Sequence, residues 1–170
     1  MGFHLRGIAT SLKTENIKEF ISLLDIDVPI VFDTESFISD FECATSIKSG
    51  KSEVFLTETR NGSMLTVWGN FPLMETYIDK ICTSGKVMKF SIDETAMKFA
   101  FEFYENGRPV RECIVNNGQV IIEEGEPLSL EKVQTDYTEI IFQLIGVITG
   151  DHFYKIEPDR KSIGCKYSRP

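Results

Sequence analysis

The chain has 170 residues, of which 42% are hydrophobic and 26% charged, and its net charge is −8 at neutral pH. This composition excludes an intrinsically disordered chain, and the length suits a single domain over residues 1–170 whose core needs no disulfide or metal. An acidic chain repels phosphate backbones, so we expect no nucleic-acid binding.

The first part of the chain is predicted to alternate short strands with short helices. A strand around His4 comes first, and a helix capped by Thr14 follows it. A strand is expected near residues 28–33, and then a short helix that begins at the capping box of Ser39 and ends near residue 49. The first helix has apolar residues at the spacing i, i+3, i+4 and i+7, namely Ile17, Phe20, Ile21 and Leu24.

Three Asn-Gly dipeptides predict β-hairpins, at residues 61–62, 106–107 and 117–118. Asn and Gly tolerate the positive φ that both central positions of a type I′ turn require, and this turn suits a two-residue hairpin. Each dipeptide is flanked by strand-like sequence, and residues 97–104 alternate large apolar with other side chains. Residues 87–123 are therefore predicted to form a four-stranded antiparallel meander.

Two more helices are expected around this meander. One begins at Pro72 and ends at Gly85, and a longer one has apolar residues at helical spacing over 133–148 with Gly150 as its C-cap. Together these elements predict an α+β fold, in which an antiparallel, meander-rich sheet has amphipathic helices packed on one face. Residues 151–170 form a C-terminal extension that could add a short edge strand and a tail.

No motif in the sequence has a catalytic signature, so we expect a protein that is not an enzyme and has no cofactor. The histidines His4 and His152 lie far apart in the chain, and no pair of cysteines has the spacing of a metal or redox site. The absence of a signal peptide or membrane-spanning run predicts a cytoplasmic protein that does not bind membranes. Free thiols are expected at Cys43, Cys82, Cys113 and Cys165.

Negative charge is concentrated in the meander and the segment that follows it. Residues 93–139 contain eleven acids and four bases, whereas residues 151–170 have a net charge of +2. Such an acidic face either keeps the protein in solution or complements a basic partner. Trp68 and Tyr104 lie next to predicted turns as candidate anchors, although Trp68 could instead cap the core. The acidic candidates for partner binding are Glu102, Glu105, Glu112, Glu123, Glu124 and Glu126.

Part of the meander resembles a family of small bacterial proteins. The resemblance rests on Tyr104-Glu105-Asn106-Gly107-Arg108-Pro109-Val110-Arg111-Glu112, on Asn117-Gly118, and on Glu124-Gly125-Glu126-Pro127-Leu128. A strand–turn–strand pattern that ends in Gly-Glu-Pro-Leu is similar to the one in immunity and accessory proteins of secreted toxin systems. The resemblance implies a compact, acidic binding protein and identifies no catalytic residue.

Three functions follow as hypotheses. The first is a non-enzymatic protein-binding module, most simply an immunity-type inhibitor that covers a basic, toxin-like partner with its acidic face. The second is a homo-oligomeric structural or regulatory domain. The third is a small-molecule-binding or hydrolytic domain, which would need a deep polar pocket between the sheet and the helices.

Overall fold

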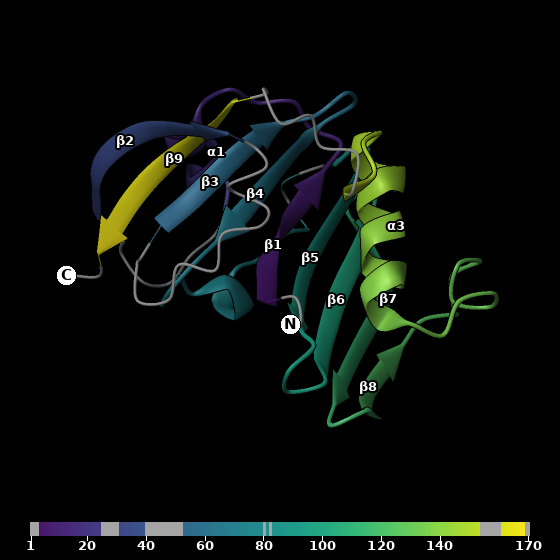
Figure 1. Ribbon diagram of the computed structural model, residues 1–170. Helices are drawn as coiled ribbons and strands as arrows, with labels where there is room; N and C mark the ends of the chain where they lie inside the picture. The colour runs from purple at the N-terminus through teal and green to yellow at the C-terminus, as the bar shows by residue number, and fades with distance from the viewer. Residues whose placement is uncertain are drawn as a thin grey trace.

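The computed structural model describes residues 4–24, 31–39, 53–79, 81, 83–153 and 161–168. In these residues nine strands form one antiparallel sheet in the order β2-β9-β3-β4-β1-β5-β6-β7-β8 (Figure 1). The strands are β1 (His4–Thr10), β2 (Val31–Ser39), β3 (Glu53–Glu58), β4 (Ser63–Val67), β5 (Lys86–Asp93), β6 (Lys98–Glu105), β7 (Arg108–Asn116), β8 (Gln119–Glu124) and β9 (Lys161–Ser168). The helical elements are α1 (Ile17–Ser22), the single 3-10 turn η1 (Leu73–Glu75) and α3 (Tyr137–Thr149).

The predicted meander is confirmed as β5 to β8, in which each strand pairs with the next in sequence. Two of its turns have the positive φ at both central residues that type I′ requires: 53° and 71° at Asn106-Gly107, and 50° and 73° at Asn117-Gly118. The hairpin between β3 and β4 also forms, but the prediction of the same turn type at residues 61–62 is wrong. Neither residue has a positive φ, and the backbone N–H of Thr59 donates to the Gly62 carbonyl over 2.9 Å, so Gly62 closes the turn and does not stand at its centre. Gly62 instead packs closely on the Thr10 backbone, where a Cβ would lie 1.9 Å from the Thr10 carbonyl oxygen.

The long helix α3 covers one face of β1, β5 and β6, which we call the α3 face. Asp136 caps it by accepting hydrogen bonds from the backbone N–H groups of Thr138 and Glu139. The helix begins later than predicted, so Val133 is 83% exposed in the preceding segment. Gly150 ends it with a φ of 79°, as predicted. The core on this face combines apolar residues of α3 with alternate residues of the strands, among them Phe90, Phe101, Ile141, Phe142 and Ile145.

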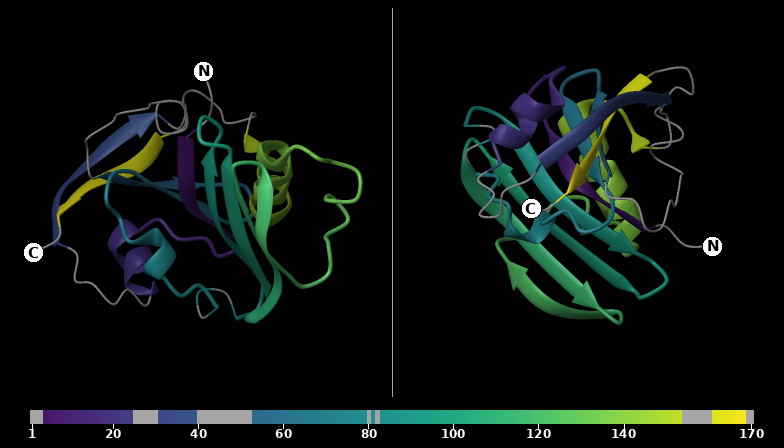
Figure 2. Two further views of the ribbon diagram at one scale, coloured as in Figure 1. Left: turned by 90° about the horizontal axis from the view of Figure 1, so that it is seen from below. Right: turned by 90° about the vertical axis from the view of Figure 1, so that its left-hand side faces the viewer.

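The short helix α1 packs on the opposite face of the sheet, which we call the α1 face. Figure 2 (left) shows α1 and α3 on the two sides of the sheet, which bends around α1. Ile17, Phe20 and Ile21 are buried here, as their spacing predicts, together with strand residues such as Ile8 and Leu65. The cap is Asn16 and not Thr14, because the Asn16 side chain accepts from the backbone N–H groups of Lys18 and Glu19. The predicted α+β fold is thus confirmed, and its helices are divided between two faces.

The helix predicted from Pro72 to Gly85 does not form in the residues described, where only the turn η1 is helical. Thr76 leaves the turn in an extended conformation, with φ −88° and ψ 139°. Two hydrogen bonds hold it there: its hydroxyl donates to the Leu73 carbonyl over 2.6 Å, and Lys89 Nζ donates to the Thr76 carbonyl over 3.1 Å. A side chain of the sheet thus takes the carbonyl that a continuing helix would use.

Strand β9 is the main feature of the C-terminal region. It lies between β2 and β3, so it is an interior strand and not the edge strand expected there. Strand β2 begins at Val31, close to the strand expected near 28–33.

Two of the four cysteines, Cys113 and Cys165, are buried free thiols as expected. The other two, Cys43 and Cys82, lie outside the described residues, and so does the helix expected from Ser39 to residue 49. None of the described helices has the length and apolarity that crossing a membrane requires.

Substitution of two glycines by alanine should change the stability of the fold in opposite directions. A Cβ on Gly7 in β1 would lie 2.3 Å from the Leu65 carbonyl oxygen, whereas a Cβ on Gly146 in α3 would make only ordinary contacts with His152, at 3.5 Å or more. We expect Gly7→Ala to lower the free energy of unfolding by about 2 kcal/mol or more. Gly146→Ala should raise it by about 0.5–1 kcal/mol. Urea denaturation measures both values, and equal effects would contradict the packing described.

Candidate functional site

One row of directly opposed residues crosses the α1 face and changes its chemistry half-way. It begins with Leu56, Leu65 and Ile8 on β3, β4 and β1, which are buried beneath α1. The row then continues through β5 to β8, where it consists of Lys89, Glu102, Glu112 and Glu124. Directly opposed residues of antiparallel strands share a face and lie close together. The register therefore places three carboxylates side by side, next to one lysine.

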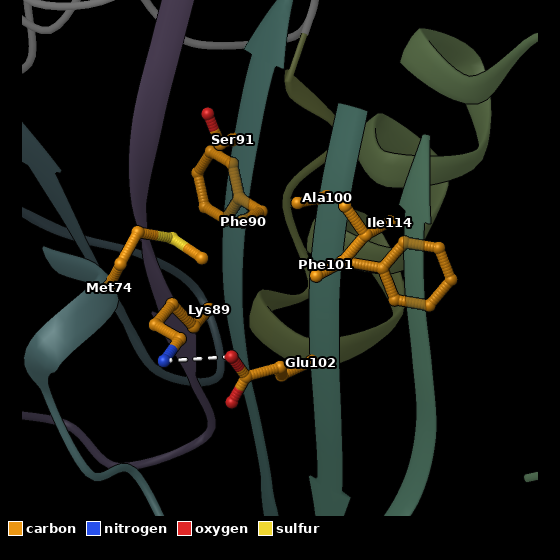
Figure 3. Close-up of a pocket in the computed structure, with 8 residues that line it drawn as sticks. All are labelled: Met74, Lys89, Phe90, Ser91, Ala100, Phe101, Glu102 and Ile114. Carbon is orange, nitrogen blue, oxygen red and sulfur yellow. Dashed lines mark ion pairs between the residues drawn. The ribbon is translucent and has the colours of Figure 1, made fainter. Parts of the chain in front are cut away.

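Lys89 lies where the row passes from the buried half to the acidic half. Its side chain is only 5% exposed, and its Nζ is 2.8 Å from Glu102 Oε1. Figure 3 shows this ion pair, with Met74 extending from η1 toward β5 beside it. Because Nζ also donates to the Thr76 carbonyl, Lys89 fixes the η1 segment to the sheet. The charge of Glu102 is thus balanced within the fold.

The η1 segment and the β6–β7 hairpin form the walls of a hollow above this acidic half. The hollow has a volume of about 620 Å³, and its lining includes Asp79, Lys89, Glu102 and Tyr104. A second hollow of about 340 Å³ shares Glu102 and Tyr104 with the first and extends to Glu112 and Glu124. Together these six residues line what we call the acidic groove.

The groove contains more negative charge than Lys89 can balance, because Arg111, which also borders the smaller hollow, pairs its charge with Glu123 and Glu131. The pKa of the Glu112 carboxyl is raised, first by burial and then by the neighbouring carboxylates Glu102 and Glu124, while Lys89 opposes the shift. The pKa of the Tyr104 hydroxyl is also raised, by burial and by Glu102, Asp79 and Glu112. Both shifts have the direction that an excess of negative charge produces, and a bound cation would reverse their electrostatic part.

Apolar and aromatic side chains stand at the rim of the groove. Met74 is 53% exposed and Tyr77 is 55% exposed, and both line the larger hollow. Tyr104, one of the predicted anchors, also lines both hollows and is half-buried. An acidic floor with two tyrosines and a methionine beside it can hold a positively charged side chain together with its aliphatic stem.

The structure separates the residues that the sequence proposed as one group. Glu102, Tyr104, Glu112 and Glu124 come together in the groove. Glu105 lies at the end of β6, where its carboxylate is 3.8 Å from Lys86 Nζ. The remaining three candidates lie elsewhere, in three different environments: Glu123, Glu126 and Trp68.

Trp68 is buried. Its side chain is 8% exposed and packs with Phe55. This is the core-capping role that the sequence left as the alternative. Glu126 is exposed and follows β8 in the segment that leads toward α3, outside both hollows.

Glu123 points to the α3 face, because it pairs with Cys113 and not with a residue of the acidic row. There it joins Arg111, whose side chain is only 2% exposed and whose Nη2 lies 2.6 Å from Glu123 and 2.7 Å from Glu131. Arg111 also donates to the Gly125 carbonyl over 2.9 Å. Its hydrogen bond with Glu131 is the main cause that raises the pKa of its guanidinium. Glu123 and Glu131 therefore serve the fold, since they neutralise a buried arginine.

Sequence reasoning missed Met74, Tyr77, Asp79 and Lys89. The first three were assigned to a helix that the structure replaces with η1 and the irregular chain after it. Lys89 carries a recognisable signal, because it is the one charged residue between apolar neighbours in Val87-Met88-Lys89-Phe90. A charge at that place in a buried strand requires a partner on a neighbouring strand.

Other polar groups do not form a competing site in the part of the chain that is described. No three His, Cys, Asp or Glu side chains there are arranged to hold a metal ion. His4 Nδ1 lies 3.4 Å from Asp93, and His152 Nε2 lies 3.7 Å from Glu139. Comparisons of the chain with protein-family models, with curated proteins and with solved structures find no significant match.

Protonation of Glu112 should make stability depend on pH. Because its pKa is higher in the folded than in the unfolded state, the folded protein binds more protons, and stability falls as pH rises from the unfolded to the folded pKa. Glu112→Gln removes this loss, so we expect the variant to be more stable than the wild type at pH 7. The two should converge below the ordinary pKa of a glutamate. Thermal unfolding at pH 4 and pH 7 measures the difference, and a constant difference would contradict this origin.

The Arg111 cluster gives a second prediction. Arg111→Met leaves Glu131, whose side chain is 9% exposed, as a buried carboxylate without its cation. Breaking such a pair costs about 3–5 kcal/mol, and urea denaturation should show a loss of this size. Arg108→Met is the control, because Arg108 is exposed at the end of β7 and its loss should cost less than about 0.5 kcal/mol. A small loss in both variants would be evidence against the buried cluster.

Proposed function

We propose that this protein is a non-enzymatic binding protein that holds a basic segment of a partner protein in the acidic groove. The observation that carries the proposal is the row Glu102–Glu112–Glu124, in which three carboxylates are directly opposed across adjacent strands. Like charges placed in this way destabilise a sheet. A lysine or arginine from a partner would relieve that repulsion, and the energy gained would favour binding.

The titrating groups of the groove support binding more than catalysis. Lys89 is held as an ion pair with Glu102 and also donates to a backbone carbonyl, so its amine is not a free nucleophile. The raised pKa of Tyr104 keeps its hydroxyl protonated at neutral pH, so it is not available there as a general base. Glu112 faces carboxylates on both neighbouring strands, and among the described residues no histidine, cysteine or serine lines either hollow as a nucleophile or an acid–base partner.

The lining of the groove defines the chemistry of the partner. Asp79, Glu112 and Glu124 offer carboxylates in addition to Glu102, and Tyr77 and Tyr104 offer aromatic rings for a cation. The exposed Met74 can contact an aliphatic side chain. We therefore infer a basic segment with aliphatic residues beside its lysines or arginines.

An immunity-type inhibitor is the form of this function that the sequence resemblance favours. A basic, toxin-like partner would present its cationic functional surface, and the groove with its rim would cover that surface. Opposite charges would speed the encounter and would make it depend on ionic strength. The inhibition would be steric, and it would require no chemistry from the groove.

Binding of a cationic peptide tests the proposal. We expect a fluorescently labelled peptide of ten alternating arginine and leucine residues to bind the wild type, and to bind more weakly when salt is raised from 50 to 300 mM. The double variant Glu112→Gln/Glu124→Gln should bind about tenfold more weakly, which corresponds to about 1.4 kcal/mol. Fluorescence anisotropy gives the affinities.

The control variant changes the net charge equally at another place. Glu15 and Glu19 are exposed beside and within α1, outside both hollows. Glu15→Gln/Glu19→Gln should bind the peptide as the wild type does. An equal loss in the two double variants would attribute binding to net charge alone, and no binding by the wild type would overturn the proposal.

A further inference from the structure

We propose that the basic partner segment binds as an added β-strand along β8, so that the sheet continues into the partner. This inference rests on the proposed function and specifies how the segment is held. In such an arrangement backbone hydrogen bonds supply affinity, and alternate side chains supply specificity. The acidic row supplies the charge that selects the strand.

Strand β8 is the terminal strand of the sheet, after β7. All six of its residues are exposed. Three adjacent β-branched apolar residues lie on it, Val120, Ile121 and Ile122, which are 47%, 59% and 37% exposed. Its sequence contains no lysine or proline, the residues that most often protect an edge strand from pairing. An edge of this composition favours the addition of a further strand.

The acidic row determines what the added strand carries. Glu124 is the last member of the row, and its carboxylate makes no ion pair with any described residue. A strand added at the usual spacing of about 4.8 Å places one side chain directly opposite Glu124 on the α1 face. A lysine or arginine at that position would meet the unbalanced charge of Glu124. The residue two positions along the added strand lies opposite Ile122 on the same face, where the aliphatic stem of a second lysine or arginine can pack.

A second copy of the chain fits this edge less well than a basic strand. Strand β8 has one more residue than β7 between Ile122 and Val120, so the strand bulges at Ile121, and the regular part open to any added strand runs from Ile122 to Glu124. Within that part Glu123 and Glu124 follow directly, and a second copy would bring the same two carboxylates to the same edge. Directly opposed like charges disfavour such pairing, whereas a cationic strand neutralises them.

Backbone methylation of a peptide separates strand addition from simple charge attraction. The probe is a peptide of eight alternating lysine and valine residues, together with two forms that are N-methylated on all lysines or on all valines. All three have the same side chains and the same charge. In a strand, the N–H groups of alternate residues point to the same side, so only one of the two sets can donate to β8. We expect one methylated form to bind at least tenfold more weakly and the other to retain the affinity of the parent peptide within about threefold.

The outcomes distinguish this inference from the proposed function on which it rests. If both methylated forms bind as the parent does, or if both lose binding, strand addition is overturned. In that case the loss caused by Glu112→Gln/Glu124→Gln still supports the groove. If the parent peptide does not bind at all, both proposals fail. Sedimentation measures whether the wild type is a dimer. If it is, if Ile121→Lys dissociates the dimer, and if the dimer does not bind the peptide, then the edge of β8 binds a second copy of the chain and strand addition by a basic partner is overturned.

Discussion

The ion pair between Lys89 and Glu102 is the interaction on which the acidic groove depends. Lys89 stands in a row of residues that runs from the core beneath α1 to the open edge of the sheet. Its amine is almost completely buried, which is possible only because a carboxylate on β6 and the Thr76 carbonyl accept its hydrogen bonds. The same three groups hold η1 over the sheet, and η1 forms one wall of the groove. The buried charge of Lys89 therefore marks the boundary of the core beneath α1 and holds one wall of the acidic groove in place.

This pair also determines how charge is distributed beyond it. Lys89 balances Glu102, and the next two members of the row, Glu112 and Glu124, form no ion pair with a base in the part of the chain that is described. The other buried cation of the meander is Arg111, and strand alternation directs it to the α3 face. There it neutralises Glu123 and Glu131 inside the fold. Adjacent residues of β7 and β8 thus have different roles: those on the α3 face stabilise the fold, and those on the α1 face carry unbalanced negative charge.

The sequence predicted those parts of the fold that depend on local patterns. Alternating apolar residues and the Asn-Gly turns at 106–107 and 117–118 identified the meander, because both signals lie within a few residues. The stripe at Ile17–Leu24 identified α1, but its face could not be predicted, since which side a helix packs on depends on the strand order. The helix after Pro72 was predicted wrongly because Lys89, distant in sequence, holds Thr76 in an extended conformation. Such tertiary hydrogen bonds override local helical spacing.

The candidate site was predicted in composition but not in arrangement. Charge counting identified the acidic segment, and it could not tell Glu123 from Glu124, although the two face opposite sides of the sheet. Register is what separates them, and register depends on the bulge at Ile121, which has no clear sequence signal. Without that extra residue the pairing of Asn116 with Gln119 would continue to Glu112 opposite Glu123, so Glu123 would join the acidic row. The bulge thus places Glu124, and not Glu123, in the row on the α1 face, and Ile122 shares that face because residues two apart in a strand point to the same side. Apolar contact and negative charge consequently meet at the same edge, and a basic strand is the partner that matches both.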